Sequence, residues 1–493
     1  MKKQCGELSL FGIVVFVWSA ISFAQGPDTL WTRRYGGTNY ECGKSVQQTS
    51  DGGYVVVGST NSHGRREDVY LIKTDENGDV LWTRTFGGGN WDQGESVLQT
   101  SDGGYLIAGN LACGWSGVCD IYVIRTDAQG DTLWTRSYGG PLEDQTHSLA
   151  ATDDGGCIIA GRKCTLSAED PDVYLVRLDA NGDTLWTKTY GGTASDGGCC
   201  VQQTHGGDIV IAGWTASFGA GGYDVWLLKT DAYGDTLWTR TYGGAGGDGG
   251  YSVQETSDGG YIIAGGTYSF GEGDCDVYLI KTNANGDTLW TKTHGGIGSD
   301  VGLSIQQTSG GYIIAGWTDW DPFSVGDWDV YLVRTDEDGE ILWTQTYGGR
   351  DEDIAWSVKQ TSDGGYIVAG ESGGDVYLLK TAPEVRIGED ESHGRAFFIA
   401  QSSPNPMIDR TSIKYQIIQP AHVRVTVHSL FGGQVKALID AQKEAGHHTI
   451  VWDATDDAGR KVPSGTYFVR LEAHTGLGTG DYSATRKVCV VRP

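Results

Sequence analysis

The sequence repeats at an interval of about 52 residues, and a tryptophan in a Leu-Trp-Thr motif marks each copy. The seven copies are Trp31, Trp82, Trp134, Trp186, Trp238, Trp290 and Trp343. A constant period of this length predicts a tandem array, in which each repeat is one supersecondary unit that buries its apolar face against its neighbours.

Each repeat contains four short runs with strand character. In the third copy they span residues 148–152, 157–160, 172–178 and 184–190, with glycine-rich or aspartate-rich joints between them. The chain has 77 glycines for turns, and its 17 tryptophans and 24 tyrosines supply apolar bulk for cores between sheets. These features predict an all-β fold in which four antiparallel strands form one propeller blade.

The repeat count predicts seven blades. The third run begins with an aspartate in every copy, at Asp68, Asp120, Asp172, Asp224, Asp276, Asp329 and Asp375. No Leu-Trp-Thr strand follows the run that starts at Asp375, whereas the copy at Trp31 precedes the first complete repeat. We therefore expect a seven-bladed β-propeller over residues 25–382 that the N-terminal strand closes, because closure removes exposed sheet edges.

Residues 1–24 have the character of a secretory signal peptide. Lys2 and Lys3 precede an apolar run, and Ser22 and Ala24 suit cleavage before Gln25. No later segment offers about 18 uninterrupted apolar residues, so no membrane span is predicted. The mature protein is expected to be secreted or to reside at the outer cell surface.

Negative charge is concentrated in the repeats. The formal net charge is −27, and residues up to Pro383 carry 23 Lys and Arg against 51 Asp and Glu. Such a surface repels nucleic acid and anionic membranes, and favours cations or neutral ligands. No nucleic-acid partner is therefore expected.

Nine cysteines follow the predicted signal peptide, and export permits disulfides among them. Cys113 and Cys119 lie in one predicted loop, and Cys157 and Cys164 flank one predicted strand. The spacing does not determine the pairing, and the odd number leaves at least one thiol outside any intramolecular disulfide.

Six joints before the tryptophan strand have the form Asp/Asn-x-x-Gly-acid, as in Asp75 to Asp79. One interpretation is a calcium loop, but no glutamate follows to complete an EF-hand. The other is a tight hairpin, which the glycine present in every copy favours because such turns require a positive φ. We predict the hairpin and keep calcium as the alternative.

A series of carboxylates occupies the joint that leads into each blade. Its members are Glu41, Asp92, Asp144, Asp196, Asp248, Asp300 and Asp353. In a propeller they would lie near the mouth of the central channel, where they could hold a cation or cap the turn by accepting backbone N–H bonds. Their presence in every blade favours the structural interpretation, because a binding site seldom recurs seven times.

The loop between the second and third strands of the sixth blade interrupts the repeat pattern. It concentrates aromatic and acidic residues, which suit stacking on sugar rings or binding a peptide. The candidate ligand-binding residues are Trp317, Asp319, Trp320, Asp321, Phe323 and Trp328. A loop that binds no ligand is the alternative.

The repeat region resembles bacterial and archaeal seven-bladed propellers built from Gly-Gly-Tyr, Asp-Val-Tyr-Leu and Leu-Trp-Thr repeats, which are distantly similar to quinoprotein propellers. This resemblance implies the fold and says little about chemistry. Quinoprotein enzymes need residues that stack on a cofactor and ligate a metal, and no positions here match them. No cofactor, metal site or catalytic residue is predicted.

The periodicity ends after a linker at residues 383–395. Residues 396–493 contain Ser-Pro-Asn-Pro at 403–406, Phe-Gly-Gly at 431–433 and Pro-Ser-Gly-Thr-Tyr at 463–467. This region resembles the Ig-like C-terminal sorting domain of type IX secretion cargo, which is similar to the Ig-like domain of flagellar hook-cap proteins. The resemblance implies a β-sandwich that engages the secretion machinery, although Met407 stands where that family commonly has an aromatic residue.

Together these features predict a cell-surface or secreted propeller that acts as a rigid binding or adhesion scaffold for a glycan or protein ligand. The alternatives are a glycan-active lyase or hydrolase and a structural surface-layer component. An enzyme would need an acid and base in close proximity. The propeller histidines at positions 63, 147, 205 and 294 occupy unrelated places in the repeat.

Overall fold

A computed structural model describes residues 26–62, 66–113, 119–165, 168–319, 328–349, 351–384, 397–399, 407, 409–417, 420–429, 433–474 and 482–492. The chain divides into two compact units, Gln25–Val385 and Arg386–Pro493, which we describe separately. The described residues form strands and turns without a helix, so none of them forms a helical membrane span. The predicted signal peptide and most of the predicted linker lie outside these residues.

The first unit consists of seven four-stranded antiparallel sheets in the described residues. Sheet one contains β2 (Glu41–Gln48), β3 (Tyr54–Thr60), β4 (Asp68–Thr74) and β5 (Val80–Phe86). Sheet two contains β6 (Trp91–Gln99), β7 (Tyr105–Cys113), β8 (Asp120–Thr126) and β9 (Thr132–Tyr138). Sheet three contains β10 (Asp144–Ala151), β11 (Cys157–Thr165), β12 (Ala168–Leu178) and β13 (Thr184–Tyr190). Sheets four and five are β14 (Asp196–Gln203), β15 (Ile209–Thr215), β16 (Asp224–Thr230) and β17 (Thr236–Tyr242), and β18 (Asp248–Glu255), β19 (Tyr261–Thr267), β20 (Asp276–Thr282) and β21 (Thr288–His294). Sheets six and seven are β22 (Asp300–Thr308), β23 (Gly311–Thr318), β24 (Asp329–Thr335) and β25 (Ile341–Tyr347), and β26 (Asp353–Gln360), β27 (Tyr366–Ser372), β28 (Asp375–Thr381) and β1 (Thr29–Tyr35).

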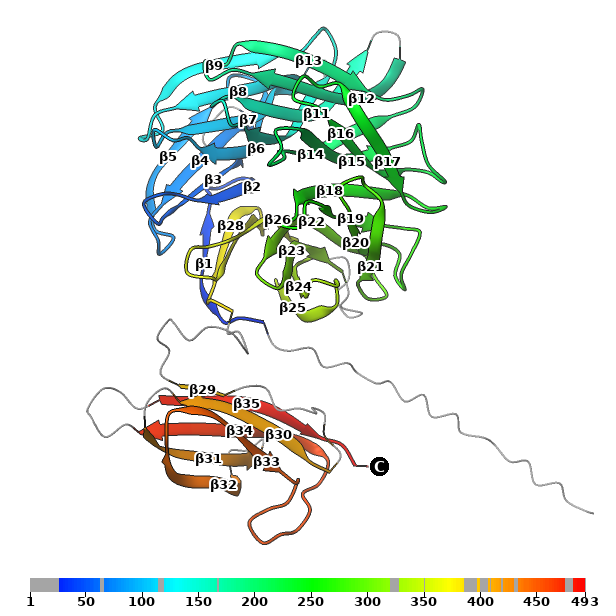
Figure 1. Cartoon of the computed structure of the whole chain (residues 1–493). Helices are drawn as coiled ribbons and strands as arrows, with labels where there is room; N and C mark the ends of the chain where they lie inside the picture. Colours follow the sequence, from blue (N-terminus) through cyan, green and yellow to red (C-terminus); the bar gives the residue numbers. More distant parts are fainter. Residues whose placement is uncertain are drawn as a thin grey trace, which may run out of the picture. The chain divides into compact units, whose positions relative to one another are not determined.

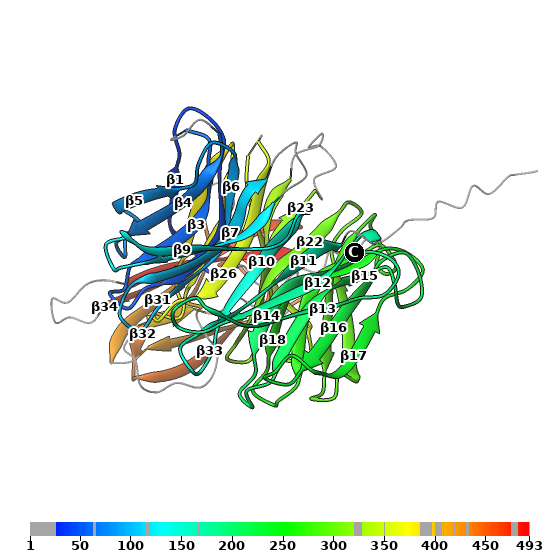
Figure 2. The ribbon, with the colours of Figure 1, turned by 90° about the horizontal axis from the view of Figure 1, so that it is seen from above.

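The sheets are blades arranged around a common centre. Figure 1 shows β2, β6, β14, β18, β22 and β26 facing that centre, with β5, β9, β13, β17, β21 and β25 at the periphery. The four strands of each blade run side by side, as the green sheet of β14 to β17 shows in Figure 2. The predicted all-β fold with four-stranded blades is confirmed.

The outer strand of the seventh blade comes from the N-terminal end of the propeller. β1 pairs antiparallel with β28, so that Trp31 lies opposite Lys380 and Tyr35 opposite Val376. This is the pairing expected from the Leu-Trp-Thr motif that precedes the first complete repeat. One hydrophobic core joins residues of the first and seventh blades, including Tyr35, Val46 and Val376.

A serine in the innermost strand hydrogen-bonds five of the seven blades to the next. The Ser148 hydroxyl accepts the Val201 N–H at 3.1 Å, and the Ser304 hydroxyl accepts the Val358 N–H at 3.2 Å. The same bond joins the last blade to the first, because the Ser357 hydroxyl accepts the Val46 N–H at 3.4 Å. The first and seventh blades are thus neighbours in the same way as blades that are consecutive in sequence.

The repeated tryptophans pack between neighbouring blades. A Cβ on Gly234 would lie 3.0 Å from the indole of Trp186, which belongs to the preceding blade. Gly234 also has φ = +79°, and the glycines of the other five hairpins of this kind have φ between +76° and +80°. Glycine is therefore required here both for the turn and for the approach of the tryptophan.

Each blade carries a cation near the end of its third strand, and five of the seven are buried: Lys73, Arg177, Lys281, Arg334 and Lys380. In blade six a carboxylate from a different segment neutralises this cation. Lys281 and Lys380 pair with Asp258 and Asp363 of the hairpin between the first two strands of their own blades. The sixth hairpin is shorter and lacks this aspartate, and the Arg334 Nε donates instead to Glu384 at 2.9 Å. The end of the propeller is thereby attached to the sixth blade.

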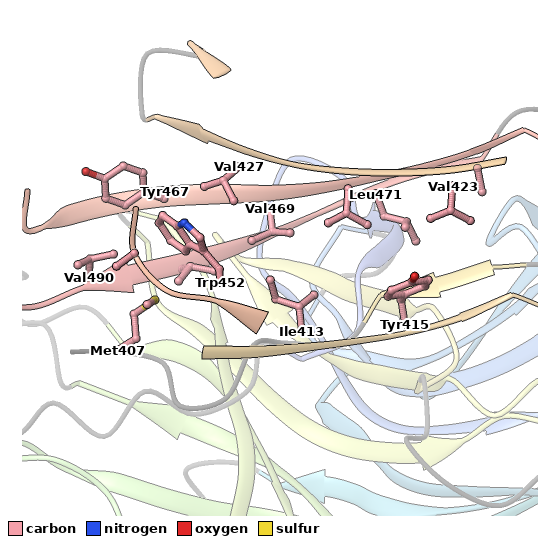
Figure 3. Close-up of a cluster of buried hydrophobic side chains, with 14 of the residues drawn as sticks. Met407, Ile413, Tyr415, Val423, Val427, Trp452, Tyr467, Val469, Leu471 and Val490 are labelled. Carbon is pink, nitrogen blue, oxygen red and sulfur yellow. The ribbon is translucent and has the colours of Figure 1, made fainter. Parts of the chain in front are cut away.

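The second unit is a β-sandwich of a three-stranded and a four-stranded sheet in the described residues. The sheets contain β29 (Phe397–Ile399), β30 (Thr411–Ile417) and β33 (Gly446–Trp452), and β32 (Gln434–Lys443), β31 (Ala421–Ser429), β34 (Gly465–His474) and β35 (Tyr482–Val490). Trp452 and Met407 are fully buried in the core between them, which Figure 3 shows. Met407 therefore fills a core position of this sandwich.

Candidate functional site

The joints between blades and the loops between second and third strands lie at the same end of the propeller, because strand direction alternates within each blade. We call this end the joint rim. The opposite end, which carries the hairpins between strands one and two and between strands three and four, is the hairpin rim.

The predicted acidic series lies beneath the surface of the joint rim. Its seven carboxylates are at most 2% exposed. In six of them, all except Asp144, an oxygen accepts the N–H of the glycine four residues earlier at 2.7–2.9 Å. The second oxygen of Glu41 accepts the Thr60 hydroxyl at 3.0 Å, which ties the joint to the second strand. These contacts correspond to the turn-capping interpretation.

Each of these carboxylates has a second carboxylate nearby, from the aspartate that begins the third strand of the preceding blade. At the joint between blades three and four, a Cβ on Gly191 would collide with Oδ1 of Asp172 and lie 2.8 Å from Oδ2 of Asp196. Burial and the charge of Asp196 raise the pKa of Asp172. The first glycine of the joint leaves room for the two carboxylates to lie side by side.

The sixth loop contributes an aromatic pair to the joint rim. The rings of Trp317 and Trp328 stack with centroids 4.7 Å apart and an interplanar angle of 26°. The Asp319 carboxylate accepts the Ser299 N–H in the joint before Asp300. The Trp328 carbonyl accepts the Asp353 N–H at 2.6 Å. The structure thus brings Trp317 and Trp328 together near the acidic series, while the candidates Trp320, Asp321 and Phe323 lie outside the described residues.

Further exposed aromatic residues occur on the joint rim. Those in the described joints and loops are Tyr40, Trp91, Phe218, Tyr223, Tyr268 and Phe270. In blade four, Tyr223 contacts Trp214 edge to face with centroids 5.0 Å apart. We did not select these residues from the sequence, although Ser-Phe-Gly occurs in the same loop of blades four and five, at 217–219 and 269–271.

A cavity of about 350 Å³ lies below Phe218, between blades three and four. Its lining includes Tyr190 and Trp226, and the indole N–H of Trp226 is buried without a hydrogen-bond partner among the described residues. Most other blades have tyrosine at this position, whose hydroxyl bonds a threonine of the fourth strand, as Tyr278 does with Thr291. The tryptophan in blade four therefore lacks the bond to the fourth strand that tyrosine makes in other blades.

The structure also places seven residues that the sequence analysis did not single out on the innermost strands. In each first strand the pairing shifts at the third residue after the member of the acidic series, and this residue forms a β-bulge that follows a Gly, Thr or Ala. In β6 a second shift lies between Trp91 and Gln93. The bulged residues are Lys44, Glu95, His147, Cys199, Tyr251, Leu303 and Trp356. We call this set the axial ring. The signal in the sequence was a position of the repeat with seven different side chains.

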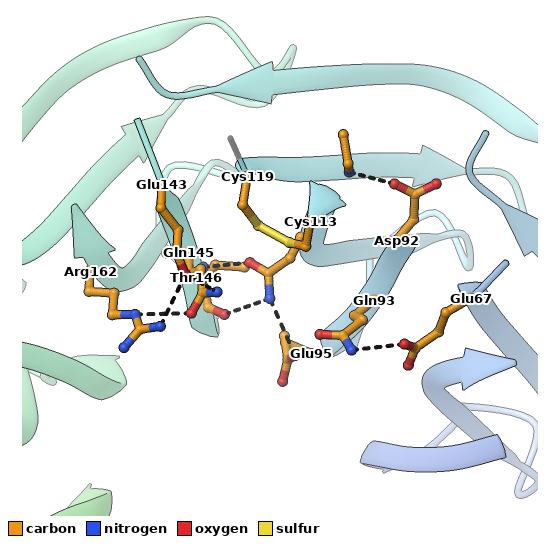
Figure 4. The surroundings of a disulfide bond; sticks show 12 residues. Glu67, Asp92, Gln93, Glu95, Cys113, Cys119, Glu143, Gln145, Thr146 and Arg162 are labelled. Atoms are coloured by element: carbon orange, nitrogen blue, oxygen red, sulfur yellow. Dashed lines mark hydrogen bonds and ion pairs between the residues drawn. A yellow bond between two sulfur atoms is a disulfide. The ribbon is translucent and has the colours of Figure 1, made fainter. Parts of the chain in front are cut away.

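A hydrogen-bonded network supports the polar part of the axial ring (Figure 4). The Asn110 side chain donates to Glu95 at 3.3 Å, and the Gln93 side chain donates to Glu67 at 3.1 Å. Burial is the main cause that raises the pKa of Glu95 to about 7. The disulfide between Cys113 and Cys119, whose pairing the sequence left open, closes the adjacent loop between β7 and β8.

The calcium alternative concerned the Asp-x-x-Gly joints. Oδ1 of Asp75 accepts the N–H groups of Asn77 and Asp79 at 2.9 and 2.8 Å. Asn283, which replaces this aspartate in blade five, makes the same two bonds, to Asn285 and Asp287. The neutral amide of Asn283 accepts the same two backbone N–H bonds as the carboxylate of Asp75. The residue at the first position of the joint therefore stabilises the hairpin turn.

The second unit is similar to a known domain family. Residues 408–476 match the FlgD Ig-like domain. The Ig-like resemblance inferred from the motifs is confirmed. The matched residues include Trp452 and Tyr467 of the sandwich core.

Other proteins match this chain over only a small part of their own length or at low sequence identity. The regulatory protein FlaEY of Caulobacter vibrioides is 30% identical over 196 residues, which are 34% of this chain and only 20% of that relative. PorZ, a bacterial surface component of the type IX secretion system of Porphyromonas gingivalis, is 12% identical with a TM-score of 0.41, covering 89% of this chain and 58% of PorZ. A fungal alcohol oxidase of the AA5 family is 10% identical with a TM-score of 0.46, covering 95% and 100% of the two chains. Similarity at this level identifies neither ligand nor activity.

Proposed function

We propose that this protein is an exported binding or adhesion scaffold whose propeller takes a neutral glycan on the joint rim of blades four to six. The observation that carries the proposal is the exposed aromatic surface of that rim, formed by Phe218, Tyr223, Tyr268 and Phe270 beside the Trp317–Trp328 stack. On the hairpin rim, the exposed aromatic among the described residues is Tyr233.

The chemistry of the rim suits uncharged sugars. The C–H faces of a sugar ring pack on aromatic faces, while its hydroxyls need fixed donors and acceptors. The side chain of Trp226, whose N–H has no hydrogen-bond partner among the described residues, lines the cavity next to Phe218. The excess of Asp and Glu in the propeller opposes binding of anionic polysaccharides.

A glycan-array screen of the mature chain tests this function. The double variant Phe218→Ala, Trp328→Ala should bind the glycan that the screen identifies at least about tenfold more weakly, because each lost stacking contact contributes roughly 0.5–1.5 kcal/mol and tenfold is about 1.4 kcal/mol. Tyr233→Ala, on the hairpin rim, is the matched control and should bind normally. Undiminished affinity of the double variant would exclude this rim, and a peptide-library hit without any glycan hit would favour a protein ligand instead.

For delivery, we propose that the FlgD Ig-like domain acts as the sorting signal for type IX secretion and does not contribute to ligand binding. Fusing residues 396–493 to an unrelated periplasmic protein, in a host with type IX machinery, should send the fusion across the outer membrane. A fusion carrying the Trp452→Ala variant is the control, because loss of this fully buried side chain disrupts the domain core. Retention of the unmodified fusion in the periplasm, while the native protein reaches the surface, would refute the proposal.

A further inference from the structure

The seven positions of the axial ring carry seven different residue types, unlike the two positions that follow them in the innermost strands. The residue that follows the bulge is serine in six blades and cysteine in one, and the next is valine, leucine or isoleucine in all seven. A residue type that the fold requires recurs in every blade, as the residue types at these two positions do. The bulge position carries lysine, glutamate, histidine, cysteine, tyrosine, leucine and tryptophan, so no single packing role accounts for it.

The ring residues converge at the centre of the propeller, from neighbouring blades and from blades that are not neighbours. The Lys44 ammonium of blade one lies 3.1 Å from the centroid of the Trp356 ring of blade seven. Burial lowers the pKa of His147 in blade three, and the charge of Lys44 contributes to this shift. Burial also lowers the pKa of Lys359 in blade seven, and Cys200 of blade four opposes that shift. Electrostatic interactions that skip over intervening blades are expected only where the innermost side chains approach the axis.

Solvent and ligands have access to this region. Within the ring, His147 is exposed and the six other members are half-buried, although all of them belong to the innermost strands. Lys359, which lies outside the ring on β26, is also exposed. The bulge explains the access, because it removes the residue from the ladder of the sheet and redirects its side chain.

The ring has a polar side and an apolar side. Blades one to three contribute Lys44, Glu95 and His147, whereas blades five to seven contribute Tyr251, Leu303 and Trp356. Lys44 on the ring and Lys359 on the same innermost surface are cations within a propeller whose net charge is strongly negative. Such local cations favour an anionic group on the axis.

We propose that the axial ring is a binding site for a small molecule with a planar apolar part and a carboxylate or similar anionic group. The planar part packs against Tyr251, Leu303 and Trp356, and the anion pairs with the Lys44 ammonium. This site is separate from the glycan rim in residues and in ligand class, so either proposal can fail without the other.

Protonation of Glu95 adds a pH dependence to the site. The charged and hydrogen-bonding groups that face it are Lys44 from β2, Glu67 from the loop before β4 and Asn110 from β7. Although the side chains of Glu95 and His147 are accessible to solvent, protein surrounds them at the centre of the propeller and desolvates their charged forms. This desolvation raises the pKa of Glu95 to about 7 and, together with nearby cations, lowers the pKa of His147 to about 4. As the pH rises from 6 to 8, Glu95 becomes a carboxylate that repels a bound anion and competes for Lys44, whereas His147 stays neutral. Anion affinity should therefore fall over this range.

Isothermal titration of the full mature chain with indole-3-carboxylate tests the site, with indole-3-carboxamide as the uncharged probe of equal shape. The carboxylate should bind saturably at pH 6 and at least tenfold more tightly than the carboxamide. Lys44→Met and Trp356→Leu should each weaken the carboxylate at least tenfold. Lys292→Met removes a surface lysine of an outer strand that pairs with Glu340, and should leave the affinity unchanged. Glu95→Gln should abolish the loss of affinity between pH 6 and pH 8.

Thermal unfolding of each variant verifies the fold, since all the substituted side chains are exposed or half-buried. Absence of saturable carboxylate binding would overturn the proposal. Equal affinity for the two probes, or unchanged binding by folded Lys44→Met and Trp356→Leu, would also overturn it.

Discussion

Deleting residues 25–37 should strongly destabilise the mature chain, because it removes β1 from the seventh blade. The deletion exposes the edge of β28 and removes Trp31, which packs against the hairpin glycine Gly78 of blade one and contacts Tyr54 edge to face with centroids 5.9 Å apart. Loss of one buried tryptophan alone costs about 3–5 kcal/mol. The expected result in a calorimetric scan is a lower transition temperature for the propeller and a greater tendency to aggregate through the open edge.

Deleting only residues 25–27 is the control for this experiment, because it leaves β1 intact. That variant should unfold like the full mature chain. If the longer deletion also unfolds at the temperature of the full chain, the N-terminal strand does not close the propeller.

Replacing Trp186 with alanine should lower the free energy of unfolding by about 3–5 kcal/mol. The ring packs in the core shared by blades three and four and lies over Gly234. Alanine leaves a cavity at that interface, and the hairpin of the next blade loses the surface on which it rests. Urea-induced unfolding monitored by circular dichroism gives the difference between variant and native chain.

The neighbouring Leu185 provides a matched control, since it belongs to the same strand and its side chain is 54% exposed. Leu185→Ala should change the free energy of unfolding by less than about 0.5 kcal/mol. A loss below about 1 kcal/mol for Trp186→Ala would contradict the packing between blades.

Repetition explains why so much of the fold could be predicted. Alternating burial in one strand is a weak signal, but seven copies of the Leu-Trp-Thr strand determine strand number, order and the partner of β1. The hairpin glycine at Gly234 was likewise predicted from its required φ. Its second role, accommodating Trp186, involves two blades and was not apparent from local turn chemistry.

The sites were predicted less completely, because they depend on deviations from the repeat. Trp317 and Trp328 were selected because they belong to one unusual loop, whereas their stacking became apparent only in the structure. The Ser-Phe-Gly loops around Phe218 and Phe270 resembled ordinary loops between second and third strands. Glu384 gave no sequence signal for its contact with Arg334, because a missing aspartate in blade six is replaced from a segment 50 residues further along the chain.

The sequence by itself determined the all-β class, the seven blades, the strand that completes the last one and the Ig-like second unit, since each follows from periodicity or from a contiguous motif. Only the tertiary structure decided that the acidic series is buried beneath the rim and that Lys44, Glu95 and Trp356 share one ring. Residues about 50 positions apart in sequence meet on the axis because every blade turns its first strand inward. The direction of each bulged side chain depends on pairing with the second strand, which no local pattern specifies.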